Sequence, residues 1–135
     1  MLLGELLSLR QLKLPVKLVV FNNSALGFVE LEMKAAGLLD FATDLVNPNF
    51  AQLAGSVGVL GLRVEKPEEL KPAIKEALSH DGPAMVEVIV NRQELSMPPT
   101  ITAEQVKGFS LYMVRAVLSG RGDEVIDLAK TNLFR

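Results

Sequence analysis

Three short apolar runs, separated by stretches with helical periodicity, are the feature that most constrains how this 135-residue chain folds. The runs lie at residues 17–21, 59–64 and 84–90, and valine and leucine dominate them. A buried parallel strand reads as a continuous apolar run, and strands that alternate with helices are typical of βαβ units. The sequence therefore predicts an α/β fold built on a parallel sheet.

The helices between these strands follow from periodicity and from helix-start signals. The first is expected near residues 3–10, a short helical piece near 29–36, and another that begins at Pro48 and Asn49. A helix that begins at Pro67 has acidic residues in its first turn, which suits the positive end of the helix dipole. Its predicted buried stripe comprises Leu70, Ile74, Ala77 and Leu78.

Two more helices are expected beyond Pro98 and Pro99, where the periodicity becomes purely helical. Thr102 and Gln105 have the spacing of a capping box at the start of the first of them. The stripe that this helix is predicted to bury is made of Val106, Phe109, Met113 and Val117. One side of the last helix carries Val125, Ile126, Ala129 and Leu133.

Composition narrows the classes of function. A net charge of −2 leaves no basic stripe to replace the counterions of a nucleic acid, so we expect no nucleic-acid partner. The chain has no cysteine, which excludes disulfides and thiolate metal sites and fits a reducing compartment. No segment approaches the ~20 apolar residues of a membrane span, so any membrane contact is expected to be peripheral.

Asn22 and Asn23 stand where the first apolar run ends. Ligands in open α/β sheets sit beyond the carboxyl ends of the strands, so these amides are well placed for oxygen ligation. In one interpretation Asn23 ligates a hard cation such as Mg²⁺ through its side-chain oxygen, and the backbone carbonyl of Ala25 assists. The alternative is a simple turn, because asparagine and serine hydrogen-bond their own backbone. The residues alone favour the turn, since no carboxylate stands beside the two amides.

The tail, residues 121–135, also has two interpretations. Its apolar side, the pair Leu133-Phe134 and the flanking arginines are typical of a helix that lies on a membrane surface. Its acidic residues favour packing on the protein instead. The single histidine, His80, stands in a turn-like stretch without a nucleophile or ligand partner, and we assign it no role.

Longer stretches resemble the carboxyl-terminal part of the thiamine-diphosphate-dependent pyruvate oxidase family. These stretches are residues 14–28, with Asn22-Asn23-Ser24-Ala25 inside them, and residues 32–34, 49–51, 63–66, 81–83 and 107–113. The ending, residues 119–135, is similar to the quinone-dependent pyruvate dehydrogenases of the bacterial membrane. The strand that ends in Asn-Asn is shared with many thiamine enzymes, acetolactate synthases included, so the tail is the more specific element.

The resemblance implies a flavoprotein oxidoreductase that decarboxylates pyruvate to acetate and CO2 and passes the electrons through FAD to ubiquinone. Such a protein would be cytoplasmic, homo-oligomeric and peripherally attached to the inner face of the cell membrane. In the family motif a segment runs from Gly-Asp-Gly to Asn-Asn, and Mg²⁺ joins it to the cofactor diphosphate.

Carried over by position, the resemblance assigns a role to individual residues of this chain. Asn23 would ligate Mg²⁺ through its side chain and Ala25 through its backbone oxygen. The residues expected to bind thiamine diphosphate are Asn22, Asn23, Ala25, Leu26, Gly27 and Phe28. The residues expected to touch membrane lipid are Val125, Ile126, Leu133 and Phe134.

The resemblance also implies parts that lie outside this sequence. The Gly-Asp-Gly would fall just upstream of Met1. The domain with the cofactor-activating glutamate and the FAD domain would also lie outside this sequence. Residues 1–100 are therefore expected to form a truncated thiamine diphosphate and Mg²⁺ domain, a partial parallel sheet with helices on both faces. Residues 101–135 would add two C-terminal helices to the same structural unit. We expect no catalytic residue in the chain, no activity of the chain alone, and self-association through its open sheet edge or its exposed apolar face.

Two other functions stay open on the sequence. The first is a fragment of an acetolactate synthase-type thiamine enzyme. The second is a non-catalytic module whose exposed faces and tail helix mediate oligomer or membrane contact.

Overall fold

The computed structural model describes residues 3–94 and 102–133, which form two compact units interleaved along the sequence. Unit 1 comprises Met1–Asn23 and Val46–Val90, and unit 2 comprises Ser24–Leu45 and Asn91–Arg135. The segment that follows Asn23 is thus grouped with the C-terminal helices.

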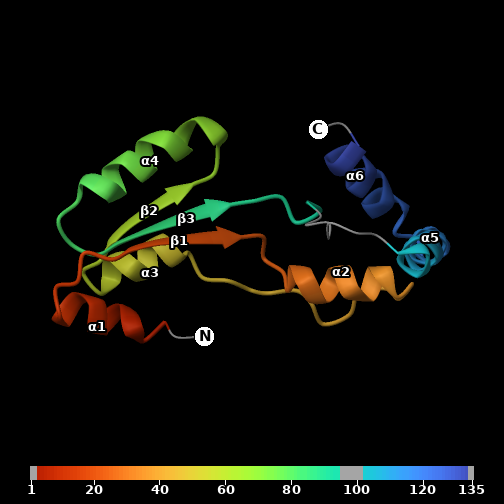
Figure 1. Cartoon of the computed structure of the whole chain (residues 1–135), viewed down its shortest axis with the longest axis horizontal. Helices are drawn as coiled ribbons and strands as arrows, with labels where there is room; N and C mark the ends of the chain where they lie inside the picture. Colours follow the sequence, from red (N-terminus) through yellow and green to blue (C-terminus); the bar gives the residue numbers. More distant parts are fainter. Residues whose placement is uncertain (1–2, 95–101, 134–135) are drawn as a thin grey trace. The chain divides into compact units, whose positions relative to one another are not determined.

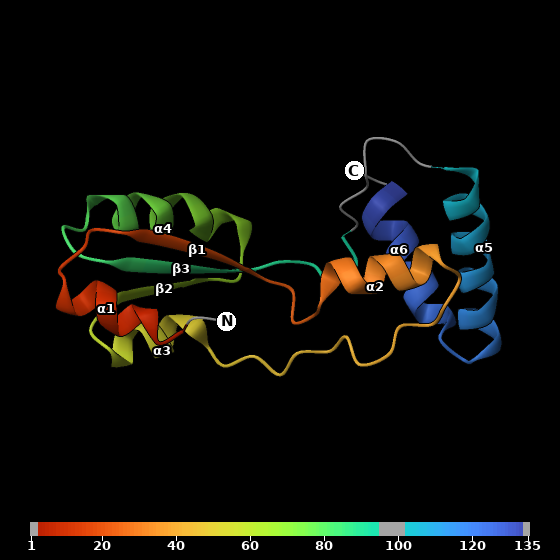
Figure 2. The same cartoon turned by 60° about the horizontal axis from the view of Figure 1, so that its bottom comes forward.

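Unit 1 is a three-stranded parallel sheet with helices on both faces (Figure 1). β1 (Lys17–Asn22), β3 (Ala84–Ile89) and β2 (Leu60–Val64) lie in that order, so β3 pairs with a neighbour on each side. The helices α1 (Glu5–Gln11) and α3 (Phe50–Ser56) cover one face, and α4 (Pro67–Ser79) covers the other (Figure 2). The predicted α/β fold with a parallel sheet and helices on both faces is confirmed.

Each face of the sheet has its own core because side chains alternate along a strand. The core under α1 and α3 is made of Leu6, Phe50, Ala54, Val59 and Met85. The core under α4 is made of Val64, Ala77, Ala84, Val86 and Val88. Gly61 of β2 lets α3 lie directly on the sheet, since a Cβ atom there would come within 1.9 Å of the Ala51 carbonyl oxygen.

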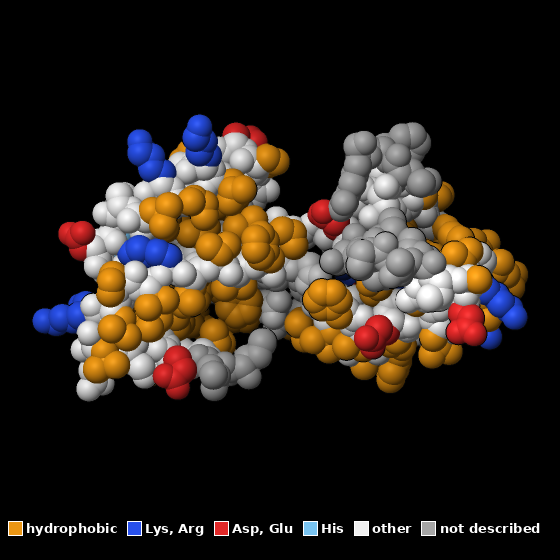
Figure 3. All heavy atoms as spheres, viewed as in Figure 1, with side chains coloured by type: hydrophobic (Ala, Val, Ile, Leu, Met, Phe, Trp, Pro, Cys, Tyr) orange, Lys and Arg blue, Asp and Glu red, His pale blue; other side chains and the backbone are white. Residues whose placement is uncertain are grey.

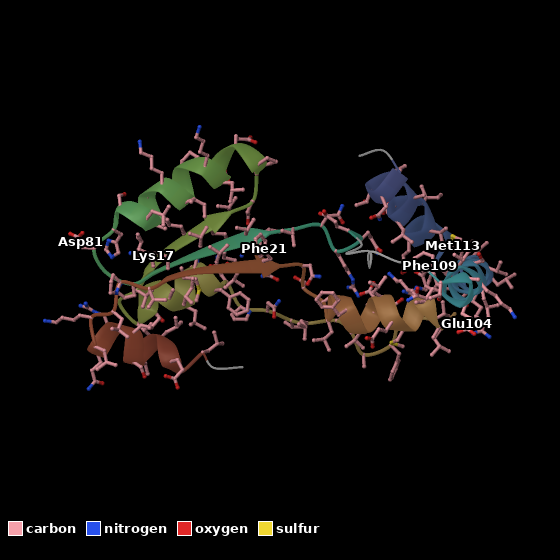
Figure 4. The ribbon with its side chains drawn as sticks, viewed as in Figure 1. Lys17, Phe21, Asp81, Glu104, Phe109 and Met113 are labelled. Carbon is pink, nitrogen blue, oxygen red and sulfur yellow. The ribbon has the colours of Figure 1, made fainter. Side chains whose placement is uncertain are left out.

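The buried stripe predicted for α4 is only partly correct. Ala77 is buried and Ile74 packs against the same core, whereas Leu78 is 67% exposed and Leu70 also lies at the surface. The cause is the narrow sheet: α4 packs on β2 and β3, so only the middle of its apolar stripe meets a partner. Val19 and Phe21 of β1, on the same face by register with β3, are also exposed. Figure 4 labels Phe21, and Figure 3 shows apolar side chains gathered on this side of unit 1.

Unit 2 is built from α2 (Gly27–Ala35), α5 (Ala103–Leu118) and α6 (Gly122–Leu133). Its core consists of Tyr112, Ala116 and Leu128, against which Leu39, Phe109, Met113 and Val125 pack. The predicted capping box is confirmed: the hydroxyl of Thr102 accepts from the backbone N–H of Gln105 at 3.3 Å, and the Gln105 side chain accepts from the Thr102 N–H at 2.9 Å.

The buried stripe of α5 lies beside the predicted one. Phe109 and Met113 pack inward (Figure 4), but Val106 and Val117 are exposed, and Tyr112 takes the central buried position. The reason is a close helix crossing at Gly108, where a Cβ atom would come within 1.9 Å of the Ala35 carbonyl oxygen of α2. Residues at four-residue steps from this glycine therefore face the core. In α6, Leu128 is buried, whereas Ile126 is exposed.

Candidate functional site

Asn22 is the last residue of β1, and both the nitrogen and the oxygen of its side-chain amide form hydrogen bonds within unit 1. Its Nδ2 donates to Oε1 of Glu87 at 2.7 Å, and its Oδ1 accepts from Nδ2 of Asn47 at 2.9 Å. The residue is buried. The amide of Asn22 thus fixes the end of the strand directly before Asn23.

Glu87, at the centre of β3, is the residue that the sequence interpretation missed. Its carboxylate has no exposed surface and also accepts from the Ala51 backbone N–H at 3.3 Å and from Nη1 of Arg63 at 2.9 Å. Burial tends to raise the pKa of this carboxyl, but the hydrogen bonds from Asn22, Ala51 and Arg63 together lower it below its usual value. The sequence did contain a signal for Glu87, namely one acidic residue inside an otherwise apolar run. A charged residue in a buried strand indicates polar partners, because buried charges need them.

Between the two predicted metal ligands stands Ser24, whose backbone has an unusual conformation. Its φ angle is 55°, in the left-handed region that residues other than glycine rarely adopt. Such residues persist only where the surrounding structure holds them, and they gather at functional sites. Asn23 is half-buried at the end of its segment of unit 1, and Ser24 is where the chain enters unit 2.

In unit 2, Ala25 is buried and forms an isolated antiparallel bridge with Asp44. The hydrogen bonds of this bridge run from the Leu26 N–H to the Thr43 carbonyl at 2.8 Å and from the Leu45 N–H to the Ser24 carbonyl at 2.9 Å. The bridge therefore fixes the backbone on both sides of Ala25.

A cluster of charged side chains secures this part of unit 2. Arg92 donates to the Asp44 carboxylate and, through Nη2, to Oε2 of Glu30 at 3.0 Å. The other oxygen of Glu30 accepts from Nζ of Lys34 at 2.5 Å, one helical turn further along α2. Glu30 and Lys34 are both buried, so the start of α2 is tied to the Ala25 bridge through Arg92.

The remaining residues predicted to bind cofactor lie at the start of α2. Leu26 precedes the helix and Gly27 is its first residue. Phe28 follows with 73% of its surface exposed.

The four residues predicted to touch lipid are not alike in the structure. Val125 packs against the core of unit 2, which matches the packing interpretation of the tail, whereas Ile126 is exposed. Leu133 is the last residue of α6, and Phe134 lies outside the described residues. Within residues 3–94 and 102–133, no helix has the length and apolar character needed to cross a membrane.

The donors at this site suit Mg²⁺ in kind, because the ion takes oxygen ligands. Asn23 offers an amide oxygen and Ala25 a backbone carbonyl oxygen, and both are neutral. In the described part of the chain, no group of three or more His, Cys, Asp or Glu side chains is placed to hold a metal ion. The residues therefore fit a cation whose charge is balanced by another group, such as a diphosphate.

Comparison with known proteins identifies the class to which this fold and site belong. Residues 1–88 match the family described as thiamine pyrophosphate enzyme, C-terminal TPP binding domain. The chain belongs to this family, so the predicted membership among thiamine enzymes is confirmed at that level.

Individual relatives add detail. The chain is 38% identical over 131 residues to YdaP of Bacillus subtilis, a protein provisionally named as containing thiamine pyrophosphate; the match covers 97% of this chain and 23% of YdaP. It is 39% identical over 95 residues to the mitochondrial acetolactate synthase of Schizosaccharomyces pombe, covering 70% of this chain and 14% of that enzyme. With the acetolactate synthase catalytic subunit of Saccharomyces cerevisiae it shares 37% identity over 99 residues, 73% of this chain and 14% of that protein. The chain thus spans less than a quarter of each of these relatives.

Proposed function

We propose that the protein to which this chain belongs is a thiamine-diphosphate-dependent flavoprotein that oxidises pyruvate. Pyruvate, water and ubiquinone would give acetate, CO2 and ubiquinol, with FAD carrying the electrons. The observation that carries the proposal is the resemblance of the tail, because the match to YdaP, which covers 131 residues with the tail included, supports thiamine diphosphate alone. The resemblance of residues 119–135 to quinone-dependent pyruvate dehydrogenases supports the choice of electron acceptor.

In this proposal the chain supplies the neutral half of a Mg²⁺ and diphosphate site. The side-chain oxygen of Asn23 and the carbonyl oxygen of Ala25 would hold the ion, and the ion would offset the charge of the diphosphate. The Ala25–Asp44 bridge sets the backbone that carries the oxygen of Ala25. When bound, thiamine diphosphate supplies a thiazolium ring that accepts the electron pair released when pyruvate loses CO2.

The proposal extends to assembly and location. The exposed apolar side chains of β1 support a homo-oligomer, because apolar surface of this kind marks protein contacts. The exposed Ile126, together with the resemblance of the tail, supports contact with the inner face of the cell membrane, with the rest of the protein in the cytoplasm.

A second candidate is an acetolactate synthase-type enzyme, which the identity of 37–39% to two acetolactate synthases favours. Asn23 and Ala25 would have the same roles in the two enzymes. The enzymes would differ in the product formed from pyruvate. Acetolactate synthesis needs no quinone.

Product analysis decides between the two candidates. The full-length protein is incubated with pyruvate, thiamine diphosphate, Mg²⁺, FAD and a soluble ubiquinone analogue, without and with lipid vesicles. We expect acetate in equal amount to reduced quinone, and a loss of at least 100-fold in Asn23→Ala, because the ion loses a ligand. Asn91→Ala is the matched control, since Asn91 is an exposed asparagine whose amide contacts Thr131. Acetolactate as the product would replace the first candidate by the second, and no product with a folded protein would favour the non-catalytic module.

A further inference from the structure

We infer that Glu87 is a positioning residue: it orients Asn22 and thereby holds the metal-binding turn that begins at Asn23. The part of this inference that concerns metal binding rests on the proposed function. The contacts that carry it lie wholly within unit 1.

The register of the sheet brings these groups together. Glu87 of β3 lies level with Val20 of β1 on one side and Arg63 of β2 on the other. Asn22 is two residues beyond Val20, so its side chain emerges on the same face of the sheet. Oε1 of Glu87 accepts from Asn22, while Oε2 accepts from the Ala51 N–H and from Arg63.

The chemistry of the contacts fixes which way the Asn22 amide points. An ionised carboxylate only accepts hydrogen bonds, so the NH₂ group of Asn22 must face Glu87. The oxygen of Asn22 must then face the other way, where Nδ2 of Asn47 donates to it at 2.9 Å. Asn22 is therefore locked in one orientation by an acceptor on one side and a donor on the other.

A buried charge is a costly way to fill a strand position if only packing is needed. Replacing buried ionic groups by apolar ones of similar size is often neutral or stabilising. Glu87 is fully buried in the central strand, where a valine or leucine would fit the pattern of its neighbours. What the carboxylate provides and an apolar residue cannot is the orientation of Asn22, directly before Asn23 and the strained Ser24.

The first test uses the chain without metal. In Glu87→Gln the new amide can donate as well as accept, so Asn22 is no longer held in one orientation. We expect backbone hydrogen exchange at Asn23 and Ser24, followed by NMR, to accelerate about fivefold or more. Val86→Ala is the matched control: it weakens the adjacent position of the same strand but faces the α4 core. Equal acceleration in both variants, or none in Glu87→Gln, would overturn the inference.

The second test adds Mn²⁺ as a paramagnetic probe of the Mg²⁺ site. In the unaltered chain we expect line broadening centred on Asn23 and Ala25, and a dissociation constant about tenfold higher in Glu87→Gln. Once Asn22 is alanine, Glu87→Gln should cause little further loss, because the two residues act in series. Additive losses would contradict this order of action.

The failure of the metal assignment can be told apart from the failure of the inference. No broadening near Asn23 in the unaltered chain would remove the proposed ligand role, while the metal-free exchange rates still decide the role of Glu87. If Glu87→Gln does not fold, Asn22→Ala takes its place, since it removes the side chain through which Glu87 is inferred to act on Asn23. Unchanged exchange at Asn23 in that variant would overturn the inference.

Discussion

Both units bury a carboxylate, but they partner it in different ways. Glu87 in unit 1 lies on a strand and accepts from one amide, one backbone N–H and one arginine, each from a different element. Glu30 in unit 2 lies on a helix and is paired with two cations, Lys34 on its own helix and Arg92 from a distant segment. A carboxylate with mixed donors orients its neighbours, whereas one with two cations neutralises buried charge. The two carboxylates should therefore fail differently when they are removed.

The largest effect is expected from Glu30→Ala, which leaves the buried Lys34 without its carboxylate partner. Breaking a buried ion pair from one side costs about 3–5 kcal/mol, because an uncompensated charge remains. We expect amide protection in α5 of unit 2 to fall accordingly, while amides of β3 in unit 1 keep theirs. Hydrogen exchange by NMR measures both units in one experiment.

Glu32→Ala is the control for this change, since Glu32 lies on the same helix and is exposed. It should alter stability by no more than about 0.5 kcal/mol. Equal loss of protection in β3 and α5 would show that the two units unfold together, and the comparison between them would then not hold.

A smaller effect is expected where each unit brings two backbones into contact at a glycine. Gly61→Ala would drive a Cβ atom against the Ala51 carbonyl in unit 1, and Gly108→Ala would do the same at Ala35 in unit 2. Overpacking of this kind costs about 1–3 kcal/mol, and each variant should weaken only its own unit.

Gly55 of α3 provides the contrast, because nothing lies within 4 Å of a Cβ atom built there. Gly55→Ala should stabilise unit 1 by about 0.5–1 kcal/mol, since alanine loses less freedom in a helix. Urea unfolding of the three variants tests the set, and a loss of stability in Gly55→Ala would contradict the assigned cause.

The smallest effect concerns Tyr112, the single tyrosine of the chain. The described structure offers its buried hydroxyl no hydrogen-bond partner. Burial, followed by the charges of Glu124 and Asp40, raises the pKa of Tyr112 to about 12 from 10.0. Ionisation of Tyr112 therefore costs no stability below pH 10, and stability falls as the pH rises through about 12.

Tyr112→Phe should remove this alkaline loss in unit 2 and stabilise the unit by about 1 kcal/mol at neutral pH, since an unpartnered hydroxyl is no longer buried. The ultraviolet absorbance of the phenolate follows the titration directly, because no other tyrosine or tryptophan contributes. A phenol that titrates near pH 10 in the folded chain would mean that Tyr112 is not buried as described.

Local signals predicted much of the fold. The apolar run at 84–90 became the buried central strand, and Pro67 with its acidic first turn became the start of α4. The capping box at Thr102 was likewise correct, since a helix start depends on groups three residues apart. Burial was predicted less well: Leu78 and Val106 have the right spacing, but both side chains are exposed. Periodicity locates an apolar face but does not say how wide its partner is.

The sequence by itself determined the strands, the helices and the strand end at Asn22, because each depends on residues close together in the chain. The role of Asn23 and Ala25 as metal ligands stays a prediction from resemblance. Only the tertiary structure decided what holds that strand end. Asn22 and Glu87 are 65 positions apart, and Ala51 and Glu87 are 36 apart. They meet because parallel pairing sets the register of β1 and β3, and because Gly61 admits α3 close to the sheet.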